Sequence, residues 1–282
     1  MWSIGIYAGE SPFHLAPHPE AENPVLTSSD VTDADARFVA DPFMIKVGAE
    51  WFMFFEIMNR QSRKGEIGLA ASSDAITWRY CERVLVEPFH LSYPCVFHYD
   101  GEFFMTPETL GRRAISLYRA RRFPFEWTLE TTLIDCTAAD PSIFRFDGKW
   151  WMFACTRPGE HDRLALYFAP QLTGPWKEHP RSPLTCGDKS ASRPAGRVLL
   201  SNGCVTRFAQ DCSLTYGASV RAFDVSEITE ESYSERENPL SPVLKSTGAG
   251  WNRDRMHHID PISVTDSLWI ACVDGCSLAD RI

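Results

Sequence analysis

The chain has 282 residues, of which 44% are hydrophobic, 12% aromatic and 23% charged, so it is too apolar for a disordered chain and can bury a substantial core. Its formal net charge of −9 and its lack of a basic run argue against a nucleic-acid partner or an anionic membrane surface. No apolar stretch approaches the roughly 18 residues of a membrane span.

Five copies of one pattern follow each other along the chain. In each copy an X-Pro dipeptide opens a β-rich run, and a turn connects this run to a second, aromatic-rich one. The copies begin at Asp41-Pro42, Tyr93-Pro94, Asp140-Pro141, Arg193-Pro194 and Asp260-Pro261. We expect each proline to stand at the start of a strand, where its fixed φ and missing N–H are tolerated.

Two more strand-like runs follow each of the first four hairpins. The third runs are 67–70, 115–118, 164–167 and 220–223, and the fourth runs are 84–86, 132–134, 183–184 and 242–244. Four strands in a unit of about 50 residues are typical of a β-propeller blade. Long amphipathic helices are absent from the pattern, which disfavours a parallel α/β sheet.

The two ends of the chain predict how the ring closes. The fifth unit stops after two strands, whereas residues 4–8 resemble a third strand and residues 24–26 a fourth strand. We therefore predict that residues 1–282 form a single domain, an all-β, five-bladed β-propeller whose fifth blade is closed by the N-terminal strands. Such closure removes free sheet edges. A β-sandwich with accidental internal similarity is the alternative.

Acidic residues gather at one predicted mouth of the ring, where inner strands start and their partners end. The first positions are Asp41, Tyr93, Asp140, Arg193 and Asp260, and the second include Glu56, Glu108, Asp211 and Asp274. A lone Asp-Pro is usually a turn starter, but three at equivalent positions indicate a site. Clustered carboxylates repel each other, which raises the pKa of at least one and suits an acid and a base acting on a glycosidic bond.

Several stretches resemble known propellers, among them Phe-Val-Ala-Asp-Pro-Phe at 38–43, His-Leu-Ser-Tyr-Pro at 90–94, Gly-Pro-Trp-Lys-Glu-His at 174–179 and His-His-Ile-Asp at 257–260. The chain resembles the five-bladed propellers of glycoside hydrolase families 43 and 32. It resembles more closely the N-terminal propeller domain of plant glucosamine inositolphosphorylceramide transferases and its bacterial relatives, over nearly the whole chain. No glycosyltransferase sequence follows, so we expect the propeller to stand alone.

The resemblance implies catalytic roles for several of these carboxylates. In the hydrolase families the first Asp is base or nucleophile, and another Asp orients the site or tunes a pKa. Asp41 would then be base or nucleophile, and Asp140 and Asp260 would orient groups or tune a pKa.

The general acid is a separate question, because the hydrolases place it after the second Asp, where this chain offers only Glu160 and Glu178 in loop-like or outer-strand contexts. Glu108 is the best-placed acid, and Glu56 holds the equivalent position one blade earlier. His257 or His258 could also donate a proton.

The predicted substrate-binding set combines polar, aromatic and basic side chains: Glu56, Tyr93, Arg193, Asp211, Tyr216, His257 and His258. Arg193 stands where three other blades carry Asp. It either balances the clustered carboxylates or binds a substrate carboxylate. The second interpretation predicts an acidic sugar, uronic or ulosonic.

We therefore predict a glycoside hydrolase with a carbohydrate substrate. The alternatives are a non-catalytic carbohydrate-binding propeller accessory to a glycosyltransferase, and a transglycosylase that uses the same residues. No Gly-rich phosphate loop, His-Glu-x-x-His or nucleophile-elbow motif is present, so we expect no cofactor and no metal. The N-terminus lacks signal-peptide features, and the nine scattered cysteines favour a reducing compartment. Both observations predict a cytoplasmic location.

Overall fold

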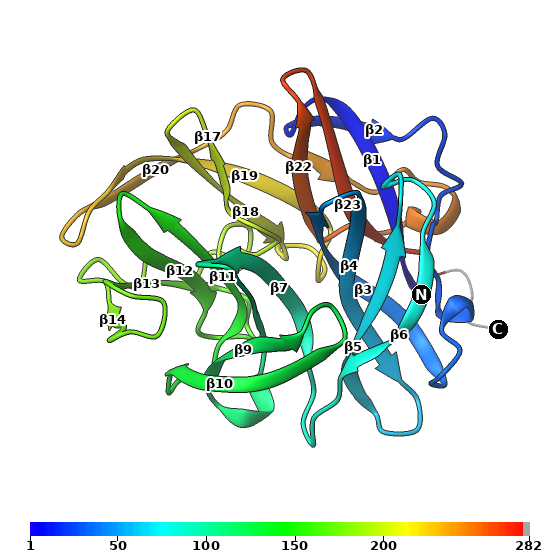
Figure 1. Cartoon of the computed structure of the whole chain (residues 1–282). Helices are drawn as coiled ribbons and strands as arrows, with labels where there is room; N and C mark the ends of the chain where they lie inside the picture. Colours follow the sequence, from blue (N-terminus) through cyan, green and yellow to red (C-terminus); the bar gives the residue numbers. More distant parts are fainter. Residues whose placement is uncertain (279–282) are drawn as a thin grey trace.

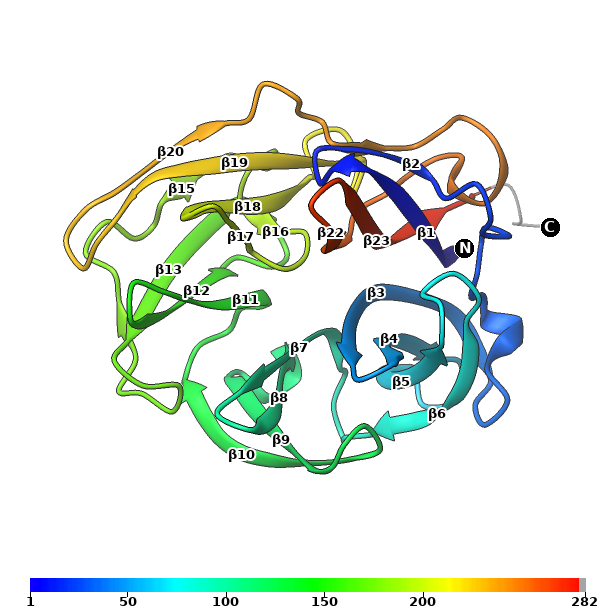
Figure 2. The same cartoon turned by 45° about the horizontal axis from the view of Figure 1, so that its top comes forward.

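The computed structural model describes residues 1–278 and shows five β-sheets around a common centre (Figures 1 and 2). Blade 1 consists of β3 (Ala36–Val47), β4 (Glu50–Asn59), β5 (Lys64–Ser72) and β6 (Arg79–Leu85). Blade 2 consists of β7 (Ser92–Tyr99), β8 (Glu102–Glu108), β9 (Ile115–Arg122) and β10 (Glu126–Ile134). In both, consecutive strands pair in order from the centre outward.

In each of the next two blades, two short segments pair with the third strand at the outer edge. Blade 3 consists of β11 (Ala139–Phe146), β12 (Lys149–Cys155), β13 (Arg163–Ala169), β14 (Lys177–Glu178) and β15 (Thr185–Cys186), the last two both pairing with β13. Blade 4 consists of β16 (Arg193–Pro194), β17 (Leu199–Ser201), β18 (Cys204–Asp211), β19 (Ser219–Ile228), β20 (Tyr233–Glu237) and β21 (Leu244–Lys245). Its inner strand is interrupted, because β16 and β17 pair separately with β18.

Blade 5 joins the two ends of the chain. It consists of β22 (Ile259–Thr265), β23 (Leu268–Cys276), β1 (Trp2–Ser11) and β2 (His14–Pro17). β1 pairs antiparallel with β23 from Trp2↔Cys276 to Gly9↔Trp269, which confirms the five-bladed propeller and its closure by N-terminal strands. The expected fourth strand at 24–26 is wrong in extent. β2 occupies most of the outer edge, and Leu26 forms only an isolated bridge with Ile4.

The core lies between neighbouring blades because each sheet is covered on both faces. Aromatic side chains make many of these contacts: Phe54 meets Trp127 at 5.5 Å between blades 1 and 2, and Tyr99 meets Trp150 at 4.9 Å between blades 2 and 3. Such edge-to-face pairs add to the stabilisation from burial. The strands are therefore rich in hydrophobic residues on both faces, as β4 shows with seven buried positions of ten.

The described residues contain only short helical turns, the 3₁₀ helices η1 (Ser28–Asp30), η2 (Leu110–Arg112) and η3 (Gly250–Asn252). None of the helices within residues 1–278 has the length and apolar character needed to cross a bilayer. That residues 1–282 form one domain stays a prediction, since 279–282 lie outside the described part.

Candidate active site

Three inner strands share an unusual backbone feature at the ring's centre. Asp41, Tyr93 and Asp140 have φ values of 51°, 50° and 53°, in the left-handed region that non-glycine residues seldom adopt. Each precedes a proline, which further disfavours helical φ and ψ, and each lies where pairing with the second strand shifts register. Such a β-bulge re-aims a side chain, and backbone strain of this kind concentrates at functional sites.

The bulge also corrects our expectation about the prolines. β3 runs through Asp41-Pro42 from Ala36 to Val47, so Pro42 stands in mid-strand and not at the first strand residue. The ladder pairs Ala40 with Glu56 and resumes at Phe43 with Phe54. Proline is tolerated between them because the bulge has already interrupted the ladder.

Four carboxyl groups from three blades meet near these bulges: Asp41, Glu56, Glu108 and Asp140. Their residues expose only 1 to 6% of their surface. Burial raises the pKa of Asp41 to about 7 against the opposing charge of His257. Burial and the neighbouring Asp140 raise the pKa of Glu108 to about 8. Burial and the surrounding carboxylates also raise the pKa of Glu56 well above its usual range, so protons are retained here at neutral pH.

Arg193 is the main positive charge within this cluster. Its Nε lies 2.6 Å from Asp140 Oδ2, and an Nη2 lies 3.6 Å from Glu108 Oε2. Its Nη1 contacts His161 Nδ1 at 3.0 Å. The Glu108 Oε2 atom is buried without a hydrogen bond among the described residues. The charge of Arg193 therefore compensates mainly that of Asp140, and Glu108 Oε2 has only a long contact with the guanidinium.

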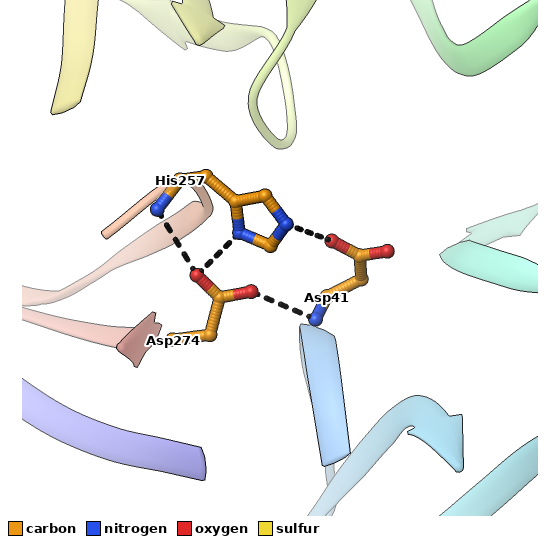
Figure 3. Close-up of side chains that lie close together, drawn as sticks. All are labelled: Asp41, His257 and Asp274. Atoms are coloured by element: carbon orange, nitrogen blue, oxygen red, sulfur yellow. Dashed lines mark hydrogen bonds and ion pairs between the residues drawn. The ribbon is translucent and has the colours of Figure 1, made fainter. Parts of the chain in front are cut away.

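A second group of side chains connects blade 5 to Asp41 (Figure 3). His257 Nδ1 lies 2.7 Å from Asp274 Oδ1, and its Nε2 lies 3.8 Å from Asp41 Oδ1. The three side chains offer ligand-type atoms within 4.8 Å of one another, a spacing that a cation could bridge. The short contact from His257 to Asp274 instead makes this an ion pair with a hydrogen bond, which leaves Nε2 facing Asp41.

His258 lies deeper in the ring, next to the same aspartate. It is fully buried, its Nδ1 is 3.8 Å from Asp41 Oδ1, and neither ring nitrogen has a hydrogen bond among the described residues. Burial lowers the pKa of His258 to about 4. A neutral imidazole follows at neutral pH, so His258 adds no charge to the site.

Two of the predicted site residues are held inside the ring. Asp260 is fully buried and takes two contacts from Arg197, at 2.8 and 3.2 Å, and a hydrogen bond from the Met44 N–H at 2.8 Å. Tyr93 is also fully buried, and its hydroxyl bonds Ser142 and the backbone of Gly196. Both side chains thus connect blades, and among the described residues neither makes a hydrogen bond to the four carboxyl groups of the cluster.

At the end of β18 the site residue is one position earlier than expected. Gln210 Nε2 donates to Asp140 Oδ2 at 2.9 Å, whereas Asp211 accepts hydrogen bonds from Ser213 within its own turn. Neighbouring strand residues point to opposite faces, so an error of one residue exchanges them. The sequence placed Asp274 at this mouth without giving it a catalytic or substrate-binding role, and it lies two residues before the end of β23.

Aromatic rings cover the blade 4 and blade 5 side of the cluster. Trp2 stacks on His257 with centroids 4.0 Å apart, and the Tyr216 ring meets His257 edge-on at 5.2 Å. The Arg193 guanidinium lies 5.1 Å from the Tyr216 centroid. Trp2 and Tyr216 are half-buried, so both reach the surface beside the carboxyl groups, and a substrate contact of Tyr216 stays a prediction.

Comparison with known proteins assigns the family. The family model described as "Glucosamine inositolphosphorylceramide transferase 1, N-terminal" matches residues 1–276. The chain belongs to this family. It is 39% identical to glucosamine inositolphosphorylceramide transferase 1 of Oryza sativa subsp. japonica and 33% identical to that of Arabidopsis thaliana, in each case over 97% of the chain. It spans 40% and 39% of those relatives' own lengths.

Solved structures with a similar fold are glycoside hydrolases. The catalytic domain of the family 62 α-L-arabinofuranosidase of Coprinopsis cinerea aligns with a TM-score of 0.64 at 10% identity, covering 97% of this chain and 99% of that one. A family 43 β-xylosidase/α-arabinofuranosidase from a compost metagenome aligns at 0.57 and 12%, covering 74% and 76%. At such identities the likeness concerns the fold alone, and it confirms the resemblance to family 43 propellers.

Proposed function

We propose that this chain is an enzyme that cleaves a glycosidic bond, with Asp41 as base or nucleophile and Glu108 as acid. The observation that carries the proposal is that two buried carboxyls of neighbouring blades have raised pKa values, about 7 for Asp41 and about 8 for Glu108. Glycoside cleavage needs one carboxyl that keeps its proton at neutral pH beside another that loses it more easily.

In the proposed reaction the Glu108 proton passes to the glycosidic oxygen as the bond from that oxygen to the anomeric carbon breaks. Asp41 then either accepts a proton from the water that attacks this carbon or bonds to the carbon itself before water releases the sugar. The separation of the two carboxyls distinguishes these routes, about 5–5.5 Å for retention and about 6.5–9.5 Å for inversion. Asp140 supports the acid because its charge raises the pKa of Glu108.

The sugar's charge is a separate part of the proposal. The acidic-sugar hypothesis rests on Arg193, and the contacts of this guanidinium with Asp140 and His161 favour charge balance within the protein. Arg193→Ala tests it: a substrate carboxylate at Arg193 predicts a KM raised about ten- to a hundredfold for a uronic-acid glycoside, and much less for a neutral one. Equal losses would leave charge balance as its role. A carbohydrate partner and a cytoplasmic location are likewise proposals.

The family's name favours one alternative. The relatives are named transferases. The same acid and base can transfer a glycosyl unit when a hydroxyl of an acceptor sugar, and not water, attacks the anomeric carbon. Glu56 is the reserve acid, because burial also raises its pKa. A carbohydrate-binding propeller without catalysis has no need for several convergent carboxyls whose ionised forms are destabilised by burial and by one another.

The experiment is a panel of neutral and acidic aryl glycosides, with and without acceptor sugars, followed by product analysis. We expect turnover by the wild-type chain and a loss of about 10²- to 10⁴-fold in Asp41→Asn and Glu108→Gln, with sugar binding retained. Asp147→Asn, in the β11–β12 turn at the opposite mouth, is the matched control. Sugar binding without turnover, unchanged in Asp41→Asn, would contradict the proposal.

A further inference from the structure

The Asp274 carboxylate accepts hydrogen bonds from three backbone N–H groups as well as from the His257 ring. Its Oδ1 accepts the N–H groups of His257 and His258 at 3.1 Å each and His257 Nδ1 at 2.7 Å. Its Oδ2 accepts the N–H of Asp41 at 3.0 Å. This fully buried carboxylate therefore ties the bulged backbone of β3 in blade 1 to the segment that precedes β22 in blade 5.

The imidazole of His257 is held on one edge and one face. Asp274 fixes the Nδ1 edge, and Trp2 stacks on the ring with an interplanar angle of 17°. The His257 side chain is only 3% exposed, so little space is left for another rotamer. The remaining polar atom, Nε2, faces the Asp41 carboxylate at 3.8 Å.

We propose that Asp274 and His257 form a positioning pair for Asp41, in which Asp274 fixes its backbone and the imidazole, and protonated His257 favours the ionised form of the Asp41 carboxyl against the effect of burial. This inference rests on the proposed function, in which Asp41 is the base or nucleophile. The pair acts through Asp41 and takes no part in bond making. It replaces the expectation that His257 binds substrate or donates a proton to the sugar.

The charges around Asp41 show why such a pair is needed. The groups that face Asp41 are Glu56 of β4, Glu108 of β8, Asp140 of β11, Arg193 of β16, Tyr216 before β19, His257 and His258 before β22, and Asp274 of β23. The carboxyls disfavour a further negative charge, and Arg193 is engaged by Asp140. His258 is neutral because its pKa is lowered to about 4, which leaves His257 as the nearest cation.

The protonation of His257 depends in turn on Asp274. Burial lowers the pKa of this imidazole, but the charge and hydrogen bond of Asp274, with the charge of Asp41, outweigh burial and raise it overall. In return, the charge and hydrogen bond of His257 lower the pKa of Asp274 although this carboxyl is buried. Removing either partner therefore changes the charge presented to Asp41.

The first test needs no substrate. In protein labelled with ¹⁵N-histidine, ring-nitrogen NMR across pH reports the protonation of His257 in the wild type, Asp274→Asn and the control His98→Gln, an exposed histidine of β7. We expect His257 to titrate above the usual value of about 6.5 in the wild type and control, and its proton affinity to fall about tenfold or more in Asp274→Asn. An unchanged titration in Asp274→Asn would overturn the inference.

A second variant keeps the test decisive where Asp274→Asn does not fold. His257→Gln retains a donor toward Asp274 and removes the cation. In protein labelled with ¹³C-aspartate, we expect the Asp41 carboxyl to hold its proton about tenfold more tightly in His257→Gln. An unchanged Asp41 titration would overturn the inference.

The acid limb of kcat/KM extends the test to the reaction, on a glycoside that the wild type turns over. It should move up by about one pH unit in His257→Gln and stay in place in His98→Gln. A fall of kcat/KM by one factor at every pH would give His257 a merely structural role and contradict the pair. Absence of glycoside turnover in the wild type counts against the proposed function, and the NMR results then stand independently.

Discussion

Asp41 and Asp260 carry the same Asp-Pro dipeptide in neighbouring blades, yet they occupy different environments. Asp41 has a φ of 51° within a β-bulge, and its pKa is raised to about 7 by burial. Asp260 pairs in regular register with Cys272, and two nitrogens of Arg197 contact its carboxylate. The two sites share the Asp-Pro dipeptide, whereas backbone geometry and the neighbouring guanidinium decide whether the carboxyl joins the buried cluster or is held in an ion pair.

The largest effect on stability is expected at the structural aspartate. Asp260→Asn leaves the half-buried Arg197 guanidinium without its negative partner, and breaking an ion pair with a buried charge typically costs about 3–5 kcal/mol. The free energy of unfolding, measured in urea, should fall by that amount, while Asp41→Asn should cost little because its carboxylate is already disfavoured by burial. Similar losses in both variants would contradict the distinction between the two aspartates.

The carboxyl cluster should make stability depend on pH. The pKa of Glu108 is raised to about 8 in the folded chain, so its contribution is fully present below the unfolded pKa of about 4.3 and is lost as pH rises toward 8. Glu108→Gln removes that loss. Relative to the wild type, this variant should gain about 3–4 kcal/mol in its free energy of unfolding between pH 5 and pH 8.

Thermal unfolding at the two pH values measures this change, and Glu126→Gln, on the exposed outer strand β10, is its control. A constant difference between Glu108→Gln and the wild type across this range would show that Glu108 titrates normally.

The smallest expected effect is a difference in stability between the variants Pro42→Ala and Pro261→Ala. Replacing either proline increases the freedom of the unfolded chain, at a cost of about 0.4–1 kcal/mol. Pro42→Ala also relieves the restriction that proline places on the left-handed Asp41, whereas Pro261→Ala relieves none. We expect Pro42→Ala to be the more stable variant by about 1 kcal/mol, from urea unfolding. Equal stabilities would mean that the bulge stores no strain.

Much of the fold could be predicted because its periodic features are visible in the sequence. The X-Pro repeats located all five inner strands, and the resemblance of residues 4–8 to a third strand predicted the pairing of β1 with β23. The outer edge of blade 5 could not be predicted in detail, because two short segments, β2 and Leu26, share it.

The sequence predicted which residue types gather at the candidate site, but it predicted less well which side chains point into it. Asp41, Glu108, Asp140 and Arg193 lie close together at the mouth where the sequence predicted an acidic cluster. Neither a bulge nor a one-residue offset in a strand leaves a clear signature in the sequence. The sequence therefore could not show that Gln210, and not Asp211, contacts Asp140. The partner of Asp260 was equally hidden, because Arg197 comes from a break in the inner strand of blade 4 and reaches across the ring.

The central claim is that the cluster around Asp41 keeps at least one carboxyl protonated at neutral pH, whereas Asp260 is held by Arg197 outside this cluster. The most direct measurement is an isotope-edited infrared titration of ¹³C-glutamate-labelled protein, comparing wild type with Glu108→Gln. We predict a protonated carboxyl band at pH 7 whose Glu108 component is missing from Glu108→Gln, while the component of Glu56 remains in both proteins. The Glu108 component should disappear from the wild type as pH rises through about 8. A Glu108 signal that is already that of a carboxylate at pH 6 would contradict the account.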